Sequence, residues 1–389
     1  MIKVLAVSRA RAVMGTEHSL LNVAPLMAPQ GVEMMLGANG GGSFERRWHE
    51  LGLGFHQLAL PHRQGFRPNT GKGYNGVTEL AMLPVRTALA IARLVRLVRR
   101  SQADVIHSNC LITHLDCAIA GRITRARSVL ELHEIVAPGI GRLAMGIAVR
   151  LCGRAVAISV AVRDQLPRWA RGNVVVIPQS VDVSRFNDVA APPDWRSRLS
   201  REPEQPIVAA VGRIDPEKGL HVLIWSVAML RAAGSTVQLA VVGSPSKDGG
   251  GYLAQLQELG ARLLGDAVRF VPQCDDVPGV LRAIDVLACP SVEEPFGLIL
   301  LEAQASGVPV VATSAGGPLD FITHDETGLL VPPGDAAALA EALRRLITDP
   351  YLWERLAQAG QARARTRFTA EIRAQRFAYL YRTLTAGRS

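Results

Sequence analysis

The chain has 389 residues, a formal net charge of +9, a hydrophobic fraction of 48%, and 36 glycines, 23 prolines and five cysteines. This length exceeds what one hydrophobic core usually holds, so we expect two globular domains. The cysteines form no CxxC pair, which argues against a disulfide framework and against a structural zinc site. No apolar run suits a signal peptide or reaches the ~18 residues of a membrane span, so we expect a cytoplasmic protein.

The first half of the chain alternates strand-like and helix-like segments, a rhythm typical of a parallel sheet. We expect a helix over residues 16–28 and Gly-rich loops over residues 39–43 and 61–76. The second loop contains a literal GxGxxG at residues 71–76, but no strand precedes it and no apolar helix follows closely. We therefore interpret it as a mobile acceptor loop and not as a dinucleotide fingerprint. The expected strands cover residues 3–8, 32–36, 105–106, 129–132, 155–158 and 174–177.

Positive charge is concentrated in the first half. Residues 1–185 contain 23 Lys and Arg against 11 Asp and Glu, whereas residues 186–389 contain 20 against 23. An apolar segment of helical spacing at residues 87–98 is accompanied by Arg86, Arg93, Arg96, Arg99 and Arg100. Such a helix can lie on an anionic membrane through its cationic face, or it can be a packed helix with a solvated face. Nucleic acid is not expected as a partner, because only 5% of the residues are aromatic and no binding motif is present.

The composition changes at residues 187–206, where Ala-Ala-Pro-Pro and two further prolines predict an interdomain linker. A second series of strands follows, and residues 351–385 have a helical pattern. The strands of this half are expected at residues 207–211, 237–242, 268–271, 286–289, 308–312 and 328–331.

Two carboxylates, Glu294 and Glu302, stand around the expected start of a helix. Pro295 suits the first helical position, and residues 296–306 have a helical apolar pattern. The carboxylates would then lie on the order of 10 Å apart along the axis, roughly the distance from a hexose across a diphosphate to a ribose. Between them an anion site is expected from the free N–H groups of Phe296, Gly297 and Leu298. The pattern favours a nucleotide-sugar site, with a plain cap and a solvated helix residue as the alternative.

Several motifs of the second half occur in a characteristic order: Val211-Gly-Arg-Ile-Asp-Pro-Glu-Lys-Gly219, Val241-Val-Gly243, Glu294-x7-Glu302, the segment 305–312, Gly316-Gly317 and the segment 327–335. With these motifs the chain resembles the retaining glycosyltransferases of family 4. The match covers nearly all of the C-terminal half and is thinner before it. Met14, for example, takes the place of the first of the family's paired glycines, ahead of Gly15.

The resemblance implies an α/β fold in the GT-B arrangement, in which two Rossmann-like domains have parallel sheets facing across a cleft. It implies an acceptor-binding domain over residues 1–186, the linker at 187–206 and a nucleotide-sugar-binding domain over residues 207–365. The terminal segment 366–389 is expected to be a helix that crosses back to the first domain.

The resemblance and the residue types together indicate the site. Arg213 and Lys218 lie on a glycine-bracketed loop and are expected to clamp the diphosphate. By resemblance Glu294 accepts the hydroxyls of the transferred sugar, and Glu302 accepts those of the ribose. The wider donor site is expected to include Gly15, Gly212, Gly243, Phe296, Gly297 and Leu298.

The acceptor site is expected in the first domain. His133 closes a strand, and by resemblance it contacts the donor sugar and orients the acceptor, while Asn109 lines the acceptor pocket. His107 is interpreted as structural. The expected catalytic residues are thus His133, Glu294, Arg213 and Lys218. No cofactor is expected, and no metal either, because the chain contains no Asp-x-Asp pair.

These features predict a retaining, metal-independent glycosyltransferase of hexosyl or N-acetylhexosaminyl type. The donor is expected to be a UDP-sugar, with GDP-mannose open, and the acceptor a lipid-linked, glycan or other anionic molecule in cell-surface glycan biosynthesis. Peripheral attachment to the inner face of the cytoplasmic membrane is expected, and the oligomeric state is not predicted. The alternatives are a nucleotide-sugar epimerase of the same fold and a catalytically silent membrane-bound partner subunit.

Overall fold

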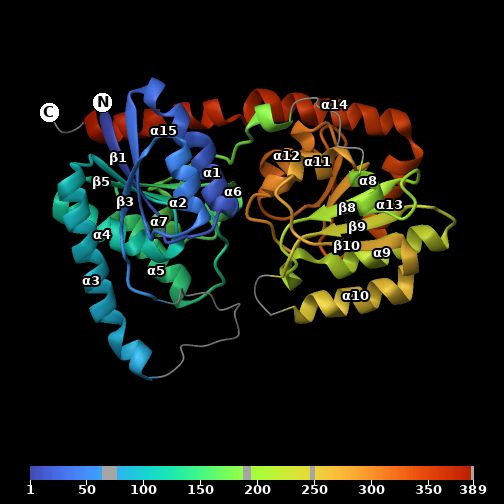
Figure 1. Ribbon diagram of the computed structural model, residues 1–389, viewed down its shortest axis with the longest axis horizontal. Coiled ribbons are helices and arrows are strands. Elements are labelled where there is room, and N and C mark those ends of the chain that lie inside the picture. Colours follow the sequence, from blue (N-terminus) through green and yellow to red (C-terminus); the bar gives the residue numbers. More distant parts are fainter. Residues whose placement is uncertain (64–76, 187–193, 246–249, 387–389) are drawn as a thin grey trace. The chain divides into compact units, whose positions relative to one another are not determined.

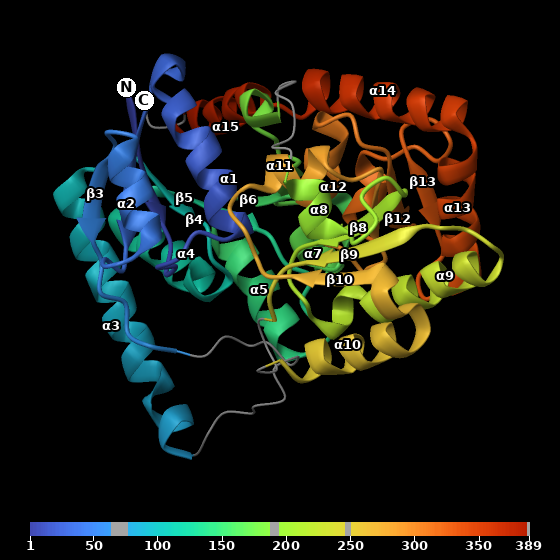
Figure 2. The ribbon, with the colours of Figure 1, turned by 45° about the vertical axis from the view of Figure 1, so that its right-hand side comes forward.

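The structure is a computed structural model that describes residues 1–63, 77–186, 194–245 and 250–386. The chain forms two compact units, one made of Met1–Ser180 with Ala370–Ser389 and the other of Val181–Thr369. Each unit contains a parallel sheet flanked by helices (Figures 1 and 2). The expected α/β class with two Rossmann-like units is confirmed. Across the described ranges, no helix combines the length and the apolar character that a membrane span requires.

The first unit has a sheet of seven strands. They are β1 (Ile2–Val7), β2 (Val32–Ala38), β3 (Gly54–Gln57), β4 (Val105–Ser108), β5 (Arg127–Leu132), β6 (Arg154–Ala157) and β7 (Val174–Val176). Their order across the sheet is β3-β2-β1-β4-β5-β6-β7, so the direction of the strand order reverses between β1 and β4. Ligands of open α/β sheets bind beyond the carboxyl ends of the strands at such a reversal.

Helices cover both faces of this sheet. They are α1 (Gly15–Val23), α2 (Ser43–Glu50), α3 (Val77–Ser101), α4 (His114–Thr124), α5 (Ile140–Leu151), α6 (Val160–Asp164), α7 (Arg168–Arg171) and α15 (Ala370–Thr385). Helix α4 packs between α3 and α5, while α15 packs against α1. The C-terminal helix α15 is therefore an integral part of the first unit, and its Phe377 and Tyr381 are buried in the core.

The second unit has a sheet of six strands. They are β8 (Ile207–Val211), β9 (Gln238–Val242), β10 (Val268–Val271), β11 (Val286–Cys289), β12 (Val310–Thr313) and β13 (Leu329–Val331). The order is β10-β9-β8-β11-β12-β13, with the reversal between β8 and β11. The central strands are nearly continuous apolar runs, as expected for a sheet buried on both faces.

The helices of the second unit are α8 (Trp195–Leu199), α9 (Leu220–Ala232), α10 (Gly251–Leu264), α11 (Val277–Arg282), α12 (Leu298–Ala305), α13 (Ala336–Thr348) and α14 (Pro350–Arg367). Side-chain hydrogen bonds cap the first turns of some of these helices. Asp335 and Asp349, for example, accept hydrogen bonds from the N–H groups of the first turns of α13 and α14.

The structure corrects several of the expected boundaries. The division lies between Ser180 and Val181 and not at residue 186, because residues 181–186 contact the second unit. Within the expected linker, residues 187–193 lie outside the described residues, but Trp195–Leu199 forms α8 in the second unit. Trp195 is buried there and donates a hydrogen bond to Asp276 over 2.7 Å. The expected terminal helix begins at Ala370 and not at residue 366.

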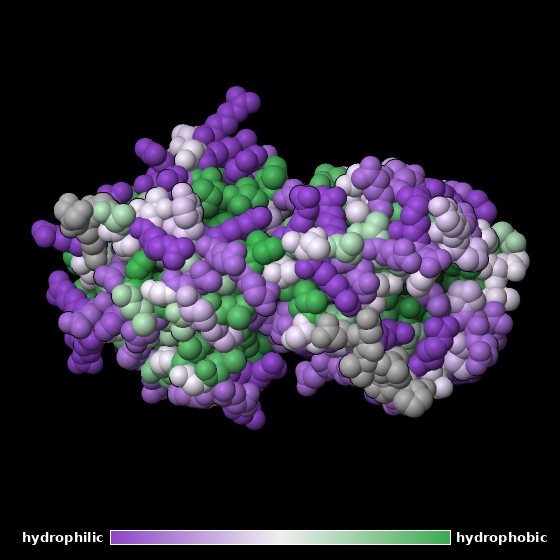
Figure 3. Space-filling model, turned by 90° about the horizontal axis from the view of Figure 1, so that it is seen from above, coloured by the Kyte–Doolittle hydropathy of each residue, from purple (hydrophilic) through white to green (hydrophobic). Residues whose placement is uncertain are grey.

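The loop with the GxGxxG pattern lies outside the described residues, so its interpretation stays a prediction. The face of the molecule seen in Figure 3 is largely hydrophilic, with hydrophobic residues standing singly or in small groups. Exposed apolar residues of this kind are normal on protein surfaces, so we infer no docking surface from this face.

Candidate active site

The loop after β8 is held against its neighbours by glycines. A Cβ atom on Gly243, which follows β9 at φ +156°, would lie 1.7 Å from the carbonyl oxygen of Gly212. On Gly219, at the end of the loop, it would lie 2.2 Å from the carbonyl oxygen of Pro290. These positions require glycine because backbone packs directly on backbone. The loop from Gly212 to Gly219 therefore lies at the carboxyl ends of β8, β9 and β11, where the strand order reverses.

Glu294 and Lys218 meet at this reversal. The Lys218 ammonium donates a hydrogen bond to the Glu294 carboxylate over 2.7 Å, and the Ser291 hydroxyl donates to the same oxygen over 2.9 Å. Burial alone would lower the pKa of Lys218, but the adjacent Glu294 carboxylate holds that pKa above its usual value. The two side chains form an ion pair. Sequence reasoning missed Ser291, which lies three residues before Glu294.

The paired glycines 316 and 317 fix the backbone around Glu294. The Gly317 N–H donates to the Glu294 carbonyl over 2.7 Å. A Cβ atom on Gly316 would lie 2.1 Å from that carbonyl oxygen, and one on Gly317 would lie 2.4 Å from Phe296 Cα. The glycine pair therefore lets the segment after β12 lie against the Glu294 backbone, which explains a motif that the sequence pattern identified without a structural reason.

Helix α12 starts later than expected. It begins at Leu298 with Gly297 as its N-cap in the left-handed region at φ +89°, so Pro295 is not the first helical residue. The physical reason is tertiary, because the Glu294 carbonyl bonds Gly317 and the buried Phe296 ring stacks on Phe321 with centroids 4.9 Å apart. Of the three predicted anion-binding N–H groups, only that of Leu298 belongs to the helix itself.

Glu302 lies in the second turn of α12 and is half-buried. Burial raises the pKa of its carboxyl to about 7, and the positive charge of Arg185 opposes this effect. A carboxyl with this pKa changes its charge in the physiological pH range. Arg185 was not predicted, because it is 117 positions away in the sequence and no local pattern connects the two.

Arg213 is about one-third exposed and forms ion pairs with Asp215 and, over 3.2 Å, with Glu217. Asp215 is fully buried, so its carboxylate fixes the guanidinium of Arg213 on the loop. The structure thus places Arg213, Lys218 and Glu294 around the carboxyl ends of β8 and β11.

The predicted residues of the first unit also come together at a reversal of strand order. Gly15 is the first residue of α1, and a Cβ atom there would meet nothing within 4 Å. Asn109 follows β4 and donates from Nδ2 to the Thr16 carbonyl over 3.2 Å. His133 follows β5, and its Nε2 lies 3.0 Å from Asn109 Oδ1. These contacts link α1, β4 and β5.

The interpretation of His107 as structural agrees with its contacts. It is buried, with Nε2 2.8 Å from Glu131 and Nδ1 bonded to the Tyr381 hydroxyl. Glu131 and Tyr381 were not singled out in the sequence.

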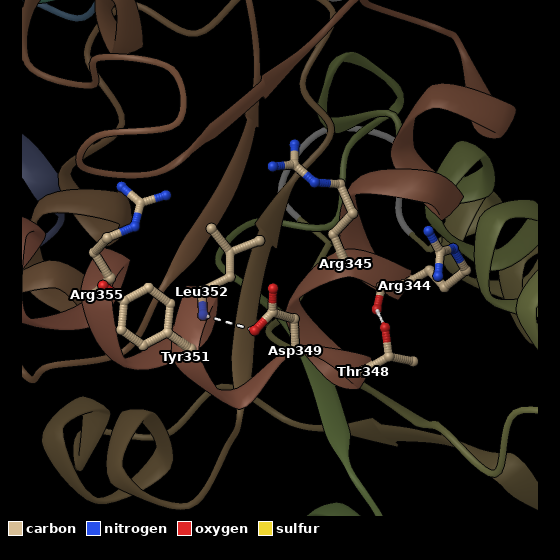
Figure 4. Close-up of a pocket in the computed structure, with 7 residues that line it drawn as sticks. All are labelled: Arg344, Arg345, Thr348, Asp349, Tyr351, Leu352 and Arg355. Atoms are coloured by element: carbon tan, nitrogen blue, oxygen red, sulfur yellow. Dashed lines mark hydrogen bonds between the residues drawn. The ribbon is translucent and has the colours of Figure 1, made fainter.

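A surface pocket of about 410 Å³ lies elsewhere in the second unit, between α13 and α14 (Figure 4). None of the predicted site residues lines it. Its arginines are already engaged, since Arg345 pairs with Asp325 and Arg344 pairs with Glu341, both over 2.7 Å. Within the described ranges, no group of three or more His, Cys, Asp or Glu side chains has metal-binding geometry.

Comparison with known proteins agrees with the fold and with the motifs. The sequence model described as "Glycosyltransferase Family 4" matches residues 13–185, and that described as "Glycosyl transferases group 1" matches residues 193–363. The chain belongs to glycosyltransferase family 4. The predicted family is thereby confirmed. Every predicted site residue lies within one of the two matched regions.

Curated relatives of the family 4 chain include D-inositol 3-phosphate glycosyltransferases. That of Salinispora arenicola is 39% identical over 203 residues, which cover 49% of this chain and 45% of the relative. That of Streptomyces bingchenggensis is 32% identical over 288 residues, which cover 68% of this chain and 63% of the relative. The chain spans about half the length of the first curated relatives that it matches.

Among solved structures, HepE of Anabaena in complex with UDP superposes with a TM-score of 0.81 at 24% identity, covering 98% of the family 4 chain and 100% of HepE. This likeness confirms the GT-B fold.

Proposed function

We propose that this chain is a retaining glycosyltransferase that moves a hexosyl or N-acetylhexosaminyl group from a nucleoside diphosphate sugar to an anionic acceptor. The observation that carries the proposal is the Lys218–Glu294 ion pair at the reversal between β8 and β11. A phosphate-binding cation and a hydroxyl-binding carboxylate within 2.7 Å of each other suit the bond between an anomeric carbon and a diphosphate.

Each residue of the second unit has a role in this proposal. Lys218 and Arg213 bind the diphosphate and stabilise the negative charge that develops on it when the glycosyl bond breaks. Glu294 accepts the hydroxyls of the transferred sugar, and Glu302 accepts those of the ribose. Because cationic side chains neutralise the leaving group, the reaction needs no divalent metal.

The reaction is proposed to proceed on one face of the sugar. The acceptor oxygen bonds to the anomeric carbon from the side that the diphosphate leaves, through front-side displacement or a short-lived oxocarbenium pair. The acceptor proton moves to the leaving phosphate oxygen, so no protein nucleophile is needed. In the first unit, Gly15, Asn109 and His133 are proposed to shape the acceptor site.

The relatives support the choice of substrates. HepE was solved with UDP, which favours a UDP-sugar over GDP-mannose as the donor. The curated relatives are named for an inositol phosphate acceptor, which supports an anionic acceptor. We place the reaction in cell-surface glycan biosynthesis, with a lipid-linked or glycan acceptor.

A donor screen tests this function. UDP-glucose, UDP-galactose, UDP-N-acetylglucosamine and GDP-mannose are each added to the protein, and the melting temperature is measured. A donor that binds only the folded state at 100 times its Kd stabilises the protein by about 2.7 kcal/mol. We expect one donor to raise the melting temperature and to release its nucleoside diphosphate slowly when no acceptor is present. If no donor does either, the proposal is wrong.

The charge of Glu302 predicts a pH dependence of donor binding. Ribose hydroxyls can donate two hydrogen bonds only to the ionised carboxylate, and its pKa is raised to about 7. Donor affinity should therefore rise with pH through 7, by about tenfold between pH 6 and pH 8. Titration calorimetry at both values should show this in the wild type and in Glu326→Gln, an exposed control. Glu302→Gln should bind the donor with the same affinity at pH 6 and pH 8. An equal change of donor affinity between the two pH values in all three proteins would contradict the role of Glu302.

We also propose membrane attachment through α3, but through fewer of its arginines than the sequence indicated. Arg86 and Arg93 are partly buried and donate to the backbone carbonyls of His62 and Ala59, so they are less accessible to lipid than the exposed arginines of the helix. The exposed arginines of α3 are Arg96, Arg99 and Arg100. Nearer its start the helix also exposes Met82, Val85 and Leu89. By helical spacing these apolar residues share a face with Arg96 and Arg100, a combination that suits the surface of an anionic membrane.

Vesicle co-sedimentation tests this attachment. Three basic residues near an anionic surface contribute about 3 kcal/mol in total, so the triple change of Arg96, Arg99 and Arg100 to Gln should weaken binding to anionic vesicles about a hundredfold. The control changes the exposed Arg262, Arg367 and Arg376 to Gln, with the same loss of charge. Equal weakening in both triple variants, or equal binding to neutral vesicles, would rule out docking through α3.

A further inference from the structure

A buried carboxylate stands next to His133 in the first unit. Glu131, in β5, is 3% exposed. Arg373 of α15 donates a hydrogen bond to one carboxylate oxygen, which also lies 3.4 Å from His133 Nε2. The other oxygen lies 2.8 Å from His107 Nε2 of β4. Three elements thus bring their charged or polar side chains to the carboxylate of Glu131.

The two connections between the units attach to this cluster. The chain leaves the first unit after Ser180 and returns to it at Ala370. Arg373, just after the return, donates to the backbone carbonyls of Pro178 and, over 3.3 Å, of Ile177. Gln179, just before the exit, lies with its Nε2 3.1 Å from His133 Nδ1. Residues beside both connections therefore contact Glu131 or His133.

The surrounding hydrogen bonds fix the tautomer of His133. Gln179 lies with its Oε1 2.5 Å from the Ser19 hydroxyl and its Nε2 3.1 Å from His133 Nδ1, so its NH2 group donates to Nδ1 when the neutral ring has its proton on Nε2. Asn109 uses its NH2 group on the Thr16 carbonyl, so its oxygen faces His133 Nε2, which must donate. Both ring nitrogens are thus engaged, with the proton on Nε2.

The charges around His133 agree with a neutral ring. Burial lowers the pKa of His133 to about 4, with Glu131 opposing this effect and the charges of Arg373 and His107 adding to it. His114 of α4 also lies near, and burial lowers its pKa to about 3. Burial alone would raise the pKa of Glu131, but His133, Arg373 and His107 hold it below its usual value. Glu131 and Arg373 carry opposite charges that compensate each other.

We propose that Glu131, Arg373 and Gln179 are positioning residues, which hold His133 as a neutral imidazole with its proton on Nε2 and so orient it in the acceptor site. The inference rests on the proposed function only for the contact of His133 with substrate. A ring whose two nitrogens are bound within the protein takes no proton from the acceptor. His133 then orients the acceptor through the shape and the dipole of its ring, and the acceptor proton moves to the leaving phosphate.

The tautomer is measured by NMR of protein labelled with 15N-histidine. The chain has nine histidines, so the His133 signals are identified by their loss in His133→Gln. We expect the wild-type ring to stay neutral with its proton on Nε2 from pH 5 to pH 8. A ring that titrates near pH 6.5, or that carries its proton on Nδ1, would overturn the proposal. The NMR measurement needs no turnover, so it tests the tautomer of His133 independently of the proposed glycosyl transfer.

The variant Gln179→Glu changes the partner of Nδ1 while keeping its shape. A carboxylate accepts a proton from Nδ1, so the proton should move to Nδ1 and the pKa of His133 should rise by about one pH unit or more. We expect kcat to fall about tenfold, with the donor KM little changed and a new loss of activity on the acid side. Gln375→Glu, the same change at an exposed position of α15, is the matched control and should stay near wild type. An unchanged tautomer or an unchanged kcat in Gln179→Glu would overturn the role of Gln179.

Arg373→Met tests the ion pair. Without the guanidinium, the Glu131 carboxylate should stabilise a positive charge on His133 and raise its pKa by about one pH unit or more. Arg373→Lys keeps the charge and should restore a neutral ring and most of the activity. If Arg373→Met folds with the wild-type tautomer, pKa and kcat of His133, the role of Arg373 is refuted. If it does not fold, the comparison of Arg373→Lys with Gln179→Glu decides between a positioning cluster and a merely structural one.

Discussion

Removal of the ammonium in Lys218→Met, or of the carboxylate charge in Glu294→Gln, is expected to lower kcat about a hundredfold. A charged hydrogen bond to the leaving diphosphate or to the sugar that carries developing positive charge contributes about 3 kcal/mol in the transition state. Because the two side chains are hydrogen-bonded to each other over 2.7 Å, their effects should not add in the double variant. Single-turnover release of the nucleoside diphosphate measures the chemical step.

Two controls keep this prediction specific. Arg344→Met removes an exposed, ion-paired cation of the same unit and should leave kcat unchanged. Lys218→Arg keeps the positive charge and should retain more activity than Lys218→Met. If Lys218→Met and Glu294→Gln have intact folds and kcat within threefold of the wild type, these residues do not act on the chemical step.

Gly243→Ala is expected to have the largest effect on stability. Its Cβ atom would lie 1.7 Å from the Gly212 carbonyl oxygen, at a φ of +156° that side chains rarely adopt. The backbone of the loop from Gly212 to Gly219 would have to shift, which should cost about 3 kcal/mol or more of a total stability of about 5–15 kcal/mol. Urea unfolding of the second unit measures the loss, and donor binding should weaken with it.

Gly172→Ala is the matched control, because a Cβ atom there meets nothing within 4 Å and the residue has a φ of −62°. Its free energy of unfolding should change by less than about 1 kcal/mol. Equal unfolding midpoints for Gly243→Ala and the wild type would show that the loop can move away, and that its backbone contact does not hold the site.

Most strands could be predicted because they are buried runs of apolar residues between glycine-rich or polar turns. β8, β10 and β11 were predicted at their observed bounds, and β1 was predicted within one residue. β3 was not predicted, because Gly-Phe-His-Gln at the sheet edge has neither an apolar run nor a clear alternation. The start of α12, expected at Pro295, was wrong by three residues, since the contact of Glu294 with Gly317 overrides the local preference of Pro295.

The candidate site shows the same limit. Residues that follow strands in sequence motifs, such as Lys218, Glu294 and His133, could be singled out from the sequence. The groups that hold them could not, because their partners are distant in sequence. Arg373 and Glu131, for example, are 242 positions apart, and no pattern in either segment reveals the other.

The most direct test of the account is the binding of UDP and GDP, measured by titration calorimetry with excess EDTA, to the wild type and to Lys218→Met. The central claim is that cations of the second unit, without a metal, bind the diphosphate of a nucleotide-sugar. The account predicts that one of the two nucleotides binds the wild type in EDTA, and that Lys218→Met binds it at least tenfold more weakly. Binding that requires Mg²⁺ or Mn²⁺, or equal affinity in both proteins, would contradict it.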